Sequence, residues 1–193
     1  MSRFSRTALP LAAILAGLPA LAPAAAQSTT ETTRRLVLSA QAQPACVISA
    51  PTAEGGVNAT FTSQGATSGQ IAIGQLVDPV SATAQASAIA IDLPVICNTS
   101  HVLTVRSANG GLARGGVVAP ATGAFREFLP YRVSVDWAGQ ALAQASDAGT
   151  AQLAVATPAQ GTARIGFATT AGGDPLVSGQ YTDALIVELA PTN

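Results

Sequence analysis

The feature that most constrains the fold is a strict alternation of apolar and polar residues between positions 129 and 137. Leu129, Tyr131, Val133, Val135 and Trp137 fall on one face, and Pro130, Arg132, Ser134 and Asp136 fall between them. A period of two residues is typical of a β-strand with one face buried and one face in solvent. Shorter stretches of the same kind, or short apolar runs between turn signals, predict further strands at 57–61, 71–77, 87–97, 101–107, 153–156, 162–169 and 181–189.

Turn signals separate these stretches, among them Asn98-Thr99-Ser100, Ala138-Gly139 and Gly172-Gly173-Asp174-Pro175. Residues 81–88 are rich in alanine but lack a helical apolar period, so we expect a loop there. Many short strands without an amphipathic helix predict an all-β chain, built as an antiparallel, immunoglobulin-like β-sandwich.

The first 26 residues have the pattern of a secretory signal. Arg3 and Arg6 precede an apolar run from position 8 to 26, which ends in Ala24-Ala25-Ala26. A basic start, an apolar middle and small residues at the cleavage site define such signals. Removing 26 of the 193 residues leaves 167, enough for one domain. We therefore expect a signal at 1–26, an N-terminal arm at 27–43 and a β-sandwich domain at 44–193.

The charge of the mature chain excludes several classes of partner. It has seven arginines, no lysine and ten acidic residues, which give a net charge of about −3. No basic stripe is present, so we expect neither nucleic acid nor an anionic membrane as a partner.

Cys46 and Cys97 are the two cysteines of the chain. An even number of cysteines in an exported protein predicts a disulfide. Closing a loop of this length stabilises a fold by about 4 kcal/mol in the chain-entropy model. A metal site would need more ligands than the single histidine, His101, provides.

The arm contains one alternating segment, at residues 34–42. Leu36, Leu38 and Ala40 fall on one face, and Arg35, Val37 and Ser39 on the other. This pattern predicts a β-strand. The sequence leaves two roles open for it: a strand of the molecule's own sheet, or a strand exported for another molecule.

Catalytic motifs are scarce. No Gly-x-Ser-x-Gly nucleophile elbow occurs, and His101 is the one imidazole available to a catalytic triad. Because His101 follows a turn and begins a strand, we expect it at an ordinary surface position. The glycine-rich residues 110–116 lack the lysine and the following helix of a phosphate-binding loop. We predict no enzyme activity, no metal and no cofactor.

Several segments together resemble one family, the spore coat protein U domain. An alternating arm precedes Cys46-Val47-Ile48, and a glycine-containing strand follows at Ile73-Gly74-Gln75-Leu76. The second cysteine ends a strand at 89–97, and two further motifs cover 128–136 and 179–187. Ile73 stands where many members have phenylalanine, and the last strand ends without the common aromatic residue. The residues that carry the motifs are Tyr131, Asp136, Gly179, Tyr181 and Asp183.

The resemblance implies a pilin-like sandwich that lacks its final strand and is completed by a strand from a neighbour. Leu36, Val37, Leu38 and Ala40 would belong to the donor strand. Implied partners are neighbouring subunits, a periplasmic chaperone and an outer-membrane usher. The implied function is that of a fibre or coat subunit, exported through the periplasm to the cell surface, in adhesion and biofilm formation. The alternative is a self-contained secreted β-sandwich that binds a ligand such as a carbohydrate.

Overall fold

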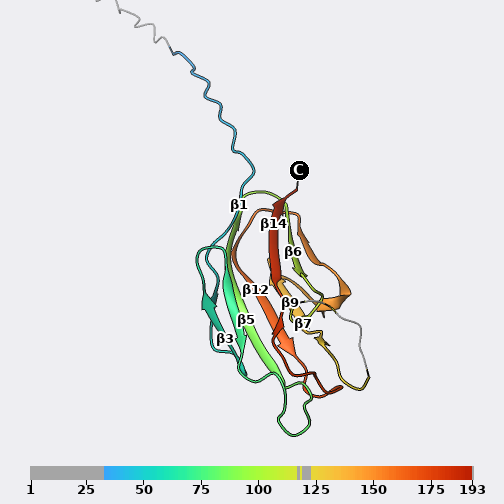
Figure 1. Ribbon diagram of the computed structural model, residues 1–193. Helices are drawn as coiled ribbons and strands as arrows, with labels where there is room; N and C mark the ends of the chain where they lie inside the picture. Colours follow the sequence, from blue (N-terminus) through green and yellow to red (C-terminus); the bar gives the residue numbers. More distant parts are fainter. Residues whose placement is uncertain (1–32, 117, 119–122, 193) are drawn as a thin grey trace, which may run out of the picture. The chain divides into compact units, whose positions relative to one another are not determined.

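The computed structural model describes residues 33–116, 118 and 123–192 (Figure 1). The expected signal at 1–26 lies outside these residues. Of the described residues, those from Gln41 onward form one compact unit, and residues 33–40 belong to a separate unit. No helix of the described residues is long and apolar enough to cross a membrane.

Two antiparallel sheets make up the unit. The larger has the order β1–β5–β12–β9–β10, with β2 also paired to β5, and the smaller has the order β11–β6–β14. Two small sheets, β13–β7–β8 and the hairpin β3–β4, complete the fold. The bounds of the larger sheet are β1 Cys46–Ile48, β2 Thr52–Ala53, β5 Ser87–Cys97, β9 Arg132–Trp137, β10 Gln140–Ala145 and β12 Ala159–Thr169. The other strands are β3 Ala59–Ser63, β4 Gly69–Ile73, β6 His101–Ser107, β7 Leu112–Arg114, β8 Phe128–Leu129, β11 Ala151–Val155, β13 Tyr181–Thr182 and β14 Leu185–Pro191, and a short 3₁₀ turn covers Ser146–Ala148.

The core lies between the two main sheets. Strands β5 and β12 pair over eleven residues, and every second residue along each of them is buried through most of their length. Buried side chains of β6 and β11 join the same cluster, including Leu103, Val105 and Leu153. The sheets approach each other at two edges, β10 with β11 and β1 with β14. The predicted antiparallel β-sandwich is confirmed.

The local predictions vary in accuracy. The single strand predicted from 129 to 137 is wrong as one element, because β8 ends at Leu129 and pairs with β7, whereas β9 begins at Arg132 in the larger sheet. Its buried face is confirmed from Tyr131 onward, since Tyr131, Val133, Val135 and Trp137 are all buried. The predicted strands at 57–61 and 71–77 are displaced: β3 begins at Ala59 and β4 ends at Ile73. The prediction of one final strand at 181–189 is wrong, because β13 and β14 are separate strands that pair with different partners. The glycine-rich residues 110–116 contain the short strand β7.

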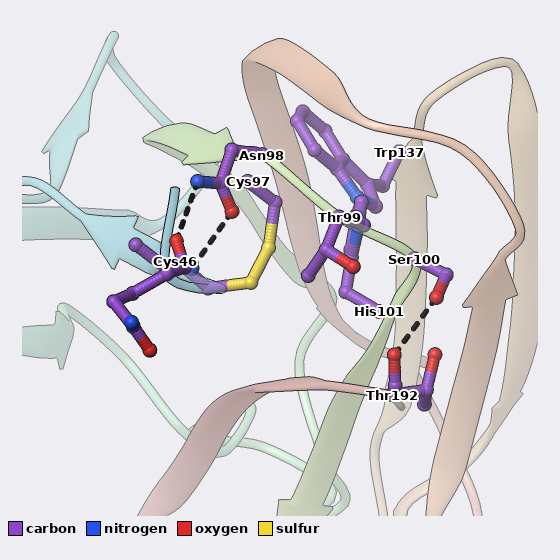
Figure 2. Close-up of a disulfide and its surroundings, with 10 residues drawn as sticks. Cys46, Cys97, Asn98, Thr99, Ser100, His101, Trp137 and Thr192 are labelled. Carbon is purple, nitrogen blue, oxygen red and sulfur yellow. Dashed lines mark hydrogen bonds between the residues drawn. A yellow bond between two sulfur atoms is a disulfide. The ribbon is translucent and has the colours of Figure 1, made fainter. Parts of the chain in front are cut away.

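The disulfide between Cys46 and Cys97 joins β1 to the end of β5 (Figure 2). Beside it, the Asn98 side chain accepts a hydrogen bond from the Ala45 N–H at 2.7 Å and donates one to the Gln43 carbonyl at 2.9 Å. The Asn98 N–H donates to the Ala45 carbonyl at 3.0 Å. These three bonds, which we call the Asn98 clamp, fix residues 43–45, the root of the arm, to the sandwich.

The surface position expected for His101 is wrong, because its side chain is 0% exposed. The Trp137 indole Nε1–H donates to His101 Nε2 at 2.8 Å, and His101 Nδ1 lies 2.9 Å from the Thr99 carbonyl. Indole nitrogen is a donor only. Nε2 therefore accepts, Nδ1 carries the proton, and the ring is neutral. His101 is a structural link between β6 and β9.

Replacing His101 by leucine tests this link. His101→Leu replaces the imidazole by an apolar side chain of similar size and leaves the buried Trp137 N–H without an acceptor. We expect a loss of about 1–3 kcal/mol in the free energy of unfolding, measured by urea denaturation of the mature chain. His101→Gln, whose amide oxygen can accept from Trp137, should lose less. Equal stability of His101→Leu and the wild type would contradict the structural role.

Candidate functional site

Strand β14 is an edge strand with an unpaired side. In the described part of the chain it pairs with β6 alone, with Leu185 opposite Ser107 and Leu189 opposite Leu103. The side chains of Leu185, Val187 and Leu189 pack against the core but are only half-buried. An edge strand with apolar side chains on one face is a template for pairing with another strand.

An apolar groove of about 980 Å³ runs beside this edge. Its floor includes Ile91 and Leu93 of β5 and Ile165 and Phe167 of β12, which belong to the core cluster. The groove thus reaches the sandwich interior. One wall is formed by residues 179–185 and Val187, and the lining also includes Ile48 and the β3–β4 hairpin.

The β3–β4 hairpin turns three apolar side chains, Phe61, Ile71 and Ile73, toward the core. Asn58 holds the base of the hairpin in place. Its side-chain amide donates to the Gln75 carbonyl at 2.6 Å and to the Ser87 hydroxyl at 2.9 Å, and its oxygen accepts from the Gln75 N–H at 2.8 Å. The wall of the groove is therefore tied to the first residue of β5.

Asp183 closes one end of the groove. Its carboxylate accepts hydrogen bonds from the Tyr131 hydroxyl at 2.7 Å, from the Ser107 hydroxyl and from the Asn109 N–H at 2.9 Å. We call these contacts the Asp183 clasp. They join Asp183, two residues before β14, to the last residue of β6 and to the residue just before β9, so the clasp fixes where the edge strand begins.

Two other motif residues stabilise the same turn. The Tyr181 hydroxyl donates to one of two carbonyls, of Val177 at 2.8 Å or Arg126 at 3.0 Å. Gly179 has φ of +152°, and a Cβ there would lie 2.7 Å from Arg114 Nε. Glycine is therefore required for Arg114 to reach the Ser178 carbonyl at 2.9 Å. Tyr131, Gly179, Tyr181 and Asp183 act together in shaping one end of the groove.

Asp136 lies elsewhere. It is exposed on the outer face of the larger sheet, opposite Arg164 of β12. The structure thus separates it from the other four motif residues, and it does not line the groove.

The cysteines and His101 form the one cluster of possible metal ligands recorded among the described residues. Its sulfur atoms are joined in the disulfide, and both His101 ring nitrogens have hydrogen-bond partners. Metal coordination would require breaking these bonds, so the cluster is structural.

The arm shows no strand of its own between positions 33 and 45. Leu36, Val37 and Leu38 are exposed, with Leu36 at 86% and Leu38 at 90%, and Ala40 is exposed as well. The pattern that predicts a strand is therefore present in a segment that pairs with nothing in the described chain.

The family model for the Spore Coat Protein U domain matches residues 32–188. Searches of curated proteins and of solved structures gave no match. The matched range covers most of the 193 residues and includes residues 32–43 of the arm, the disulfide, the groove and the clasp.

Alkaline unfolding tests the clasp. Burial first, and the bond to Asp183 second, raise the pKa of the Tyr131 phenol well above its usual value of 10. Because the folded chain holds this proton more tightly than the unfolded chain, stability is complete below about pH 10 and falls as the pH rises further. We expect Tyr131→Phe to lower the free energy of unfolding by about 1–3 kcal/mol at pH 7. Because the variant lacks the phenol, its free energy of unfolding should decrease less steeply than that of the wild type above pH 10.

The measurement is urea unfolding from pH 7 to 11. Tyr181→Phe serves as the matched control, since burial also raises the Tyr181 pKa, but at a more exposed site. Tyr181→Phe should change the decrease in the free energy of unfolding above pH 10 less than Tyr131→Phe does. Identical pH profiles for Tyr131→Phe and the wild type would refute the role of the buried phenol.

Proposed function

The chain belongs to the Spore Coat Protein U domain family, and we propose that it is an exported structural subunit of a surface fibre or coat of the chaperone–usher type. The family is a structural, pilin-like one that includes subunits of chaperone–usher pili. Assembly proceeds by strand donation: the arm of one subunit completes the sandwich of the next. The assembled fibre serves adhesion and biofilm formation.

The observation that carries this proposal is the groove beside the unpaired edge of β14. A strand laid along this edge can hydrogen-bond to the backbone of β14 and place alternate side chains over Ile165 and Phe167. In that position its apolar side chains leave water, which stabilises the complex by about 25 cal/mol per Å² of buried apolar surface.

The donor is the arm of a second copy of the chain. Leu36, Leu38 and Ala40 alternate with Val37 and Ser39, the period that a groove on one face of a sheet requires. The three apolar side chains Leu36, Val37 and Leu38 are exposed in the single chain, so burying them against a neighbour favours assembly.

The same groove explains the other partners. An open apolar edge is an aggregation hazard before assembly. A periplasmic chaperone shields it, and an outer-membrane usher is the site where the arm of the next subunit replaces the chaperone. The subunit passes through the periplasm and reaches the cell surface in the fibre.

Deleting the arm tests the proposal. A variant lacking residues 29–41 keeps the whole sandwich and both cysteines, so it should fold and bind its chaperone. It should not form polymers, because it has no strand to donate. Co-expression with a periplasmic chaperone, followed by size-exclusion chromatography and native gels, measures both properties. Polymers of wild-type length would refute the donor role.

A synthetic peptide of residues 33–42 supplies the matching control. It should bind the arm-deleted variant and raise its melting temperature, since it restores the missing strand in trans. The same peptide with Leu36→Asp and Leu38→Asp should have no effect, because charged side chains cannot be buried over the core. Equal stabilisation by both peptides would show that binding does not use the groove.

A further inference from the structure

The hydrogen bonds that flank β14 reveal which backbone groups face the groove. The Ala108 N–H donates to the Ala184 carbonyl, and the Thr192 N–H donates to the Ser100 carbonyl, both at 2.8 Å. Bonded pairs alternate along an antiparallel ladder. In this register the even-numbered residues of β14 bond to β6, and Leu185, Val187 and Leu189 direct their N–H and C=O groups to the free edge.

The orientation of the β14 backbone and side chains determines which arm residues enter the groove. Directly opposite residues of paired strands point to the same face of the sheet. The side chains of Leu185 and Val187 face the core, so their partners in the arm do too. Leu36 and Leu38 satisfy this requirement, whereas a shift of one residue would turn Arg35, Val37 and Ser39 inward.

The two ends of the groove determine the direction of the arm. The last residues of β14 lie beside the domain's own arm root, because the Ser100 hydroxyl donates to the Thr192 carbonyl at 2.9 Å, two residues from Asn98 (Figure 2). A parallel arm would bring the donor domain to this end, where the acceptor's own arm leaves. An antiparallel arm places the donor domain at the opposite end, beside the Asp183 clasp, and the contact can then repeat from copy to copy.

The charges and sizes of the side chains favour one pairing register between the arm and β14. When Leu36 lies opposite Val187 and Leu38 opposite Leu185, Arg35 falls opposite Glu188. Glu188 is exposed on the outer face, where its carboxylate lies 3.6 Å from the Arg106 guanidinium. Opposite charges across strands are favourable.

The same register has two further effects. Val37 lies opposite the half-buried Ile186, which pairs two apolar residues on the outer face. Ala40, the smallest of the inward residues, reaches the level of Asp183, where the clasp fills the groove.

We propose that the arm of a second copy pairs antiparallel to β14 with Leu36 opposite Val187, Leu38 opposite Leu185 and Arg35 opposite Glu188. This assignment rests on the proposed function and specifies the partner segment residue by residue. It leaves only Gln41 and Ala42 between the groove and the Asn98 clamp of the donor. Two to three extended residues span about 10 Å, so successive domains are joined closely.

Cross-linking tests the register with full-length chains. Outer-face pairs are the non-hydrogen-bonded ones in this register, with Cα atoms about 4.5 Å apart, a distance that a disulfide can bridge. One chain carries Val37→Cys and the other Ile186→Cys, and the two are co-expressed. We expect a disulfide-linked dimer on non-reducing gels that neither variant forms alone.

A second donor cysteine reports the direction. Ser39→Cys should cross-link to Ala184→Cys, its antiparallel partner, and not to Glu188→Cys, which it would face in a parallel pairing. A dimer formed mainly by Ser39→Cys with Glu188→Cys overturns the proposed direction. A dimer formed by Val37→Cys with Glu188→Cys, but not with Ile186→Cys, overturns the register.

The charge pair gives an independent measurement. Arg35→Glu and Glu188→Arg should each reduce polymer yield about two- to five-fold, and the double variant should recover most of the loss. No recovery in the double variant would argue against this pair. Wild-type polymers without any of the expected cross-links refute the register and leave the proposed function standing. Failure of the wild-type chain to polymerise refutes both.

Discussion

The free edge of β14, open to the sandwich core, is the constraint on which the rest of the structure depends. Strand β6 holds this edge strand from one side only. The Asp183 clasp anchors its beginning, and the contacts between Ser100 and Thr192 anchor its end. An edge fixed at both ends is pre-organised, so a donated strand need not order it, and less conformational entropy is lost on binding.

The arm root is as firmly placed as the groove. The disulfide joins β1 to β5, and the Asn98 clamp holds the residues just before it. The root and the final residues of β14 lie at one end of the sandwich, and the clasp marks the other end of the groove. In the fibre that we propose, each domain would therefore define the direction of assembly: its arm leaves at one end, and the donor domain docks at the opposite end.

Local pattern predicted part of the site. The alternation at Leu36, Leu38 and Ala40 identified the arm, and its strand pattern without an internal partner is consistent with a donated segment. Tyr131, Gly179, Tyr181 and Asp183 were recognisable as motif residues, but their shared role in one turn was not. His101 was placed wrongly, although it shares the face of Leu103 and Val105 in the alternation of β6. The alternation of β6, which places His101 on the same face as Leu103 and Val105, was the signal in the sequence that predicts the burial of His101.

The sequence by itself determined the all-β class, the disulfide between the two cysteines and the alternating pattern of residues 34–42. A period of two residues and the chemistry of exported cysteines are local properties. The tertiary structure alone decided which strands pair, that β13 and β14 separate, and that a groove opens between β14 and the β3–β4 hairpin. Pairing joins residues far apart in the chain, and a period of two residues specifies a face but not a partner.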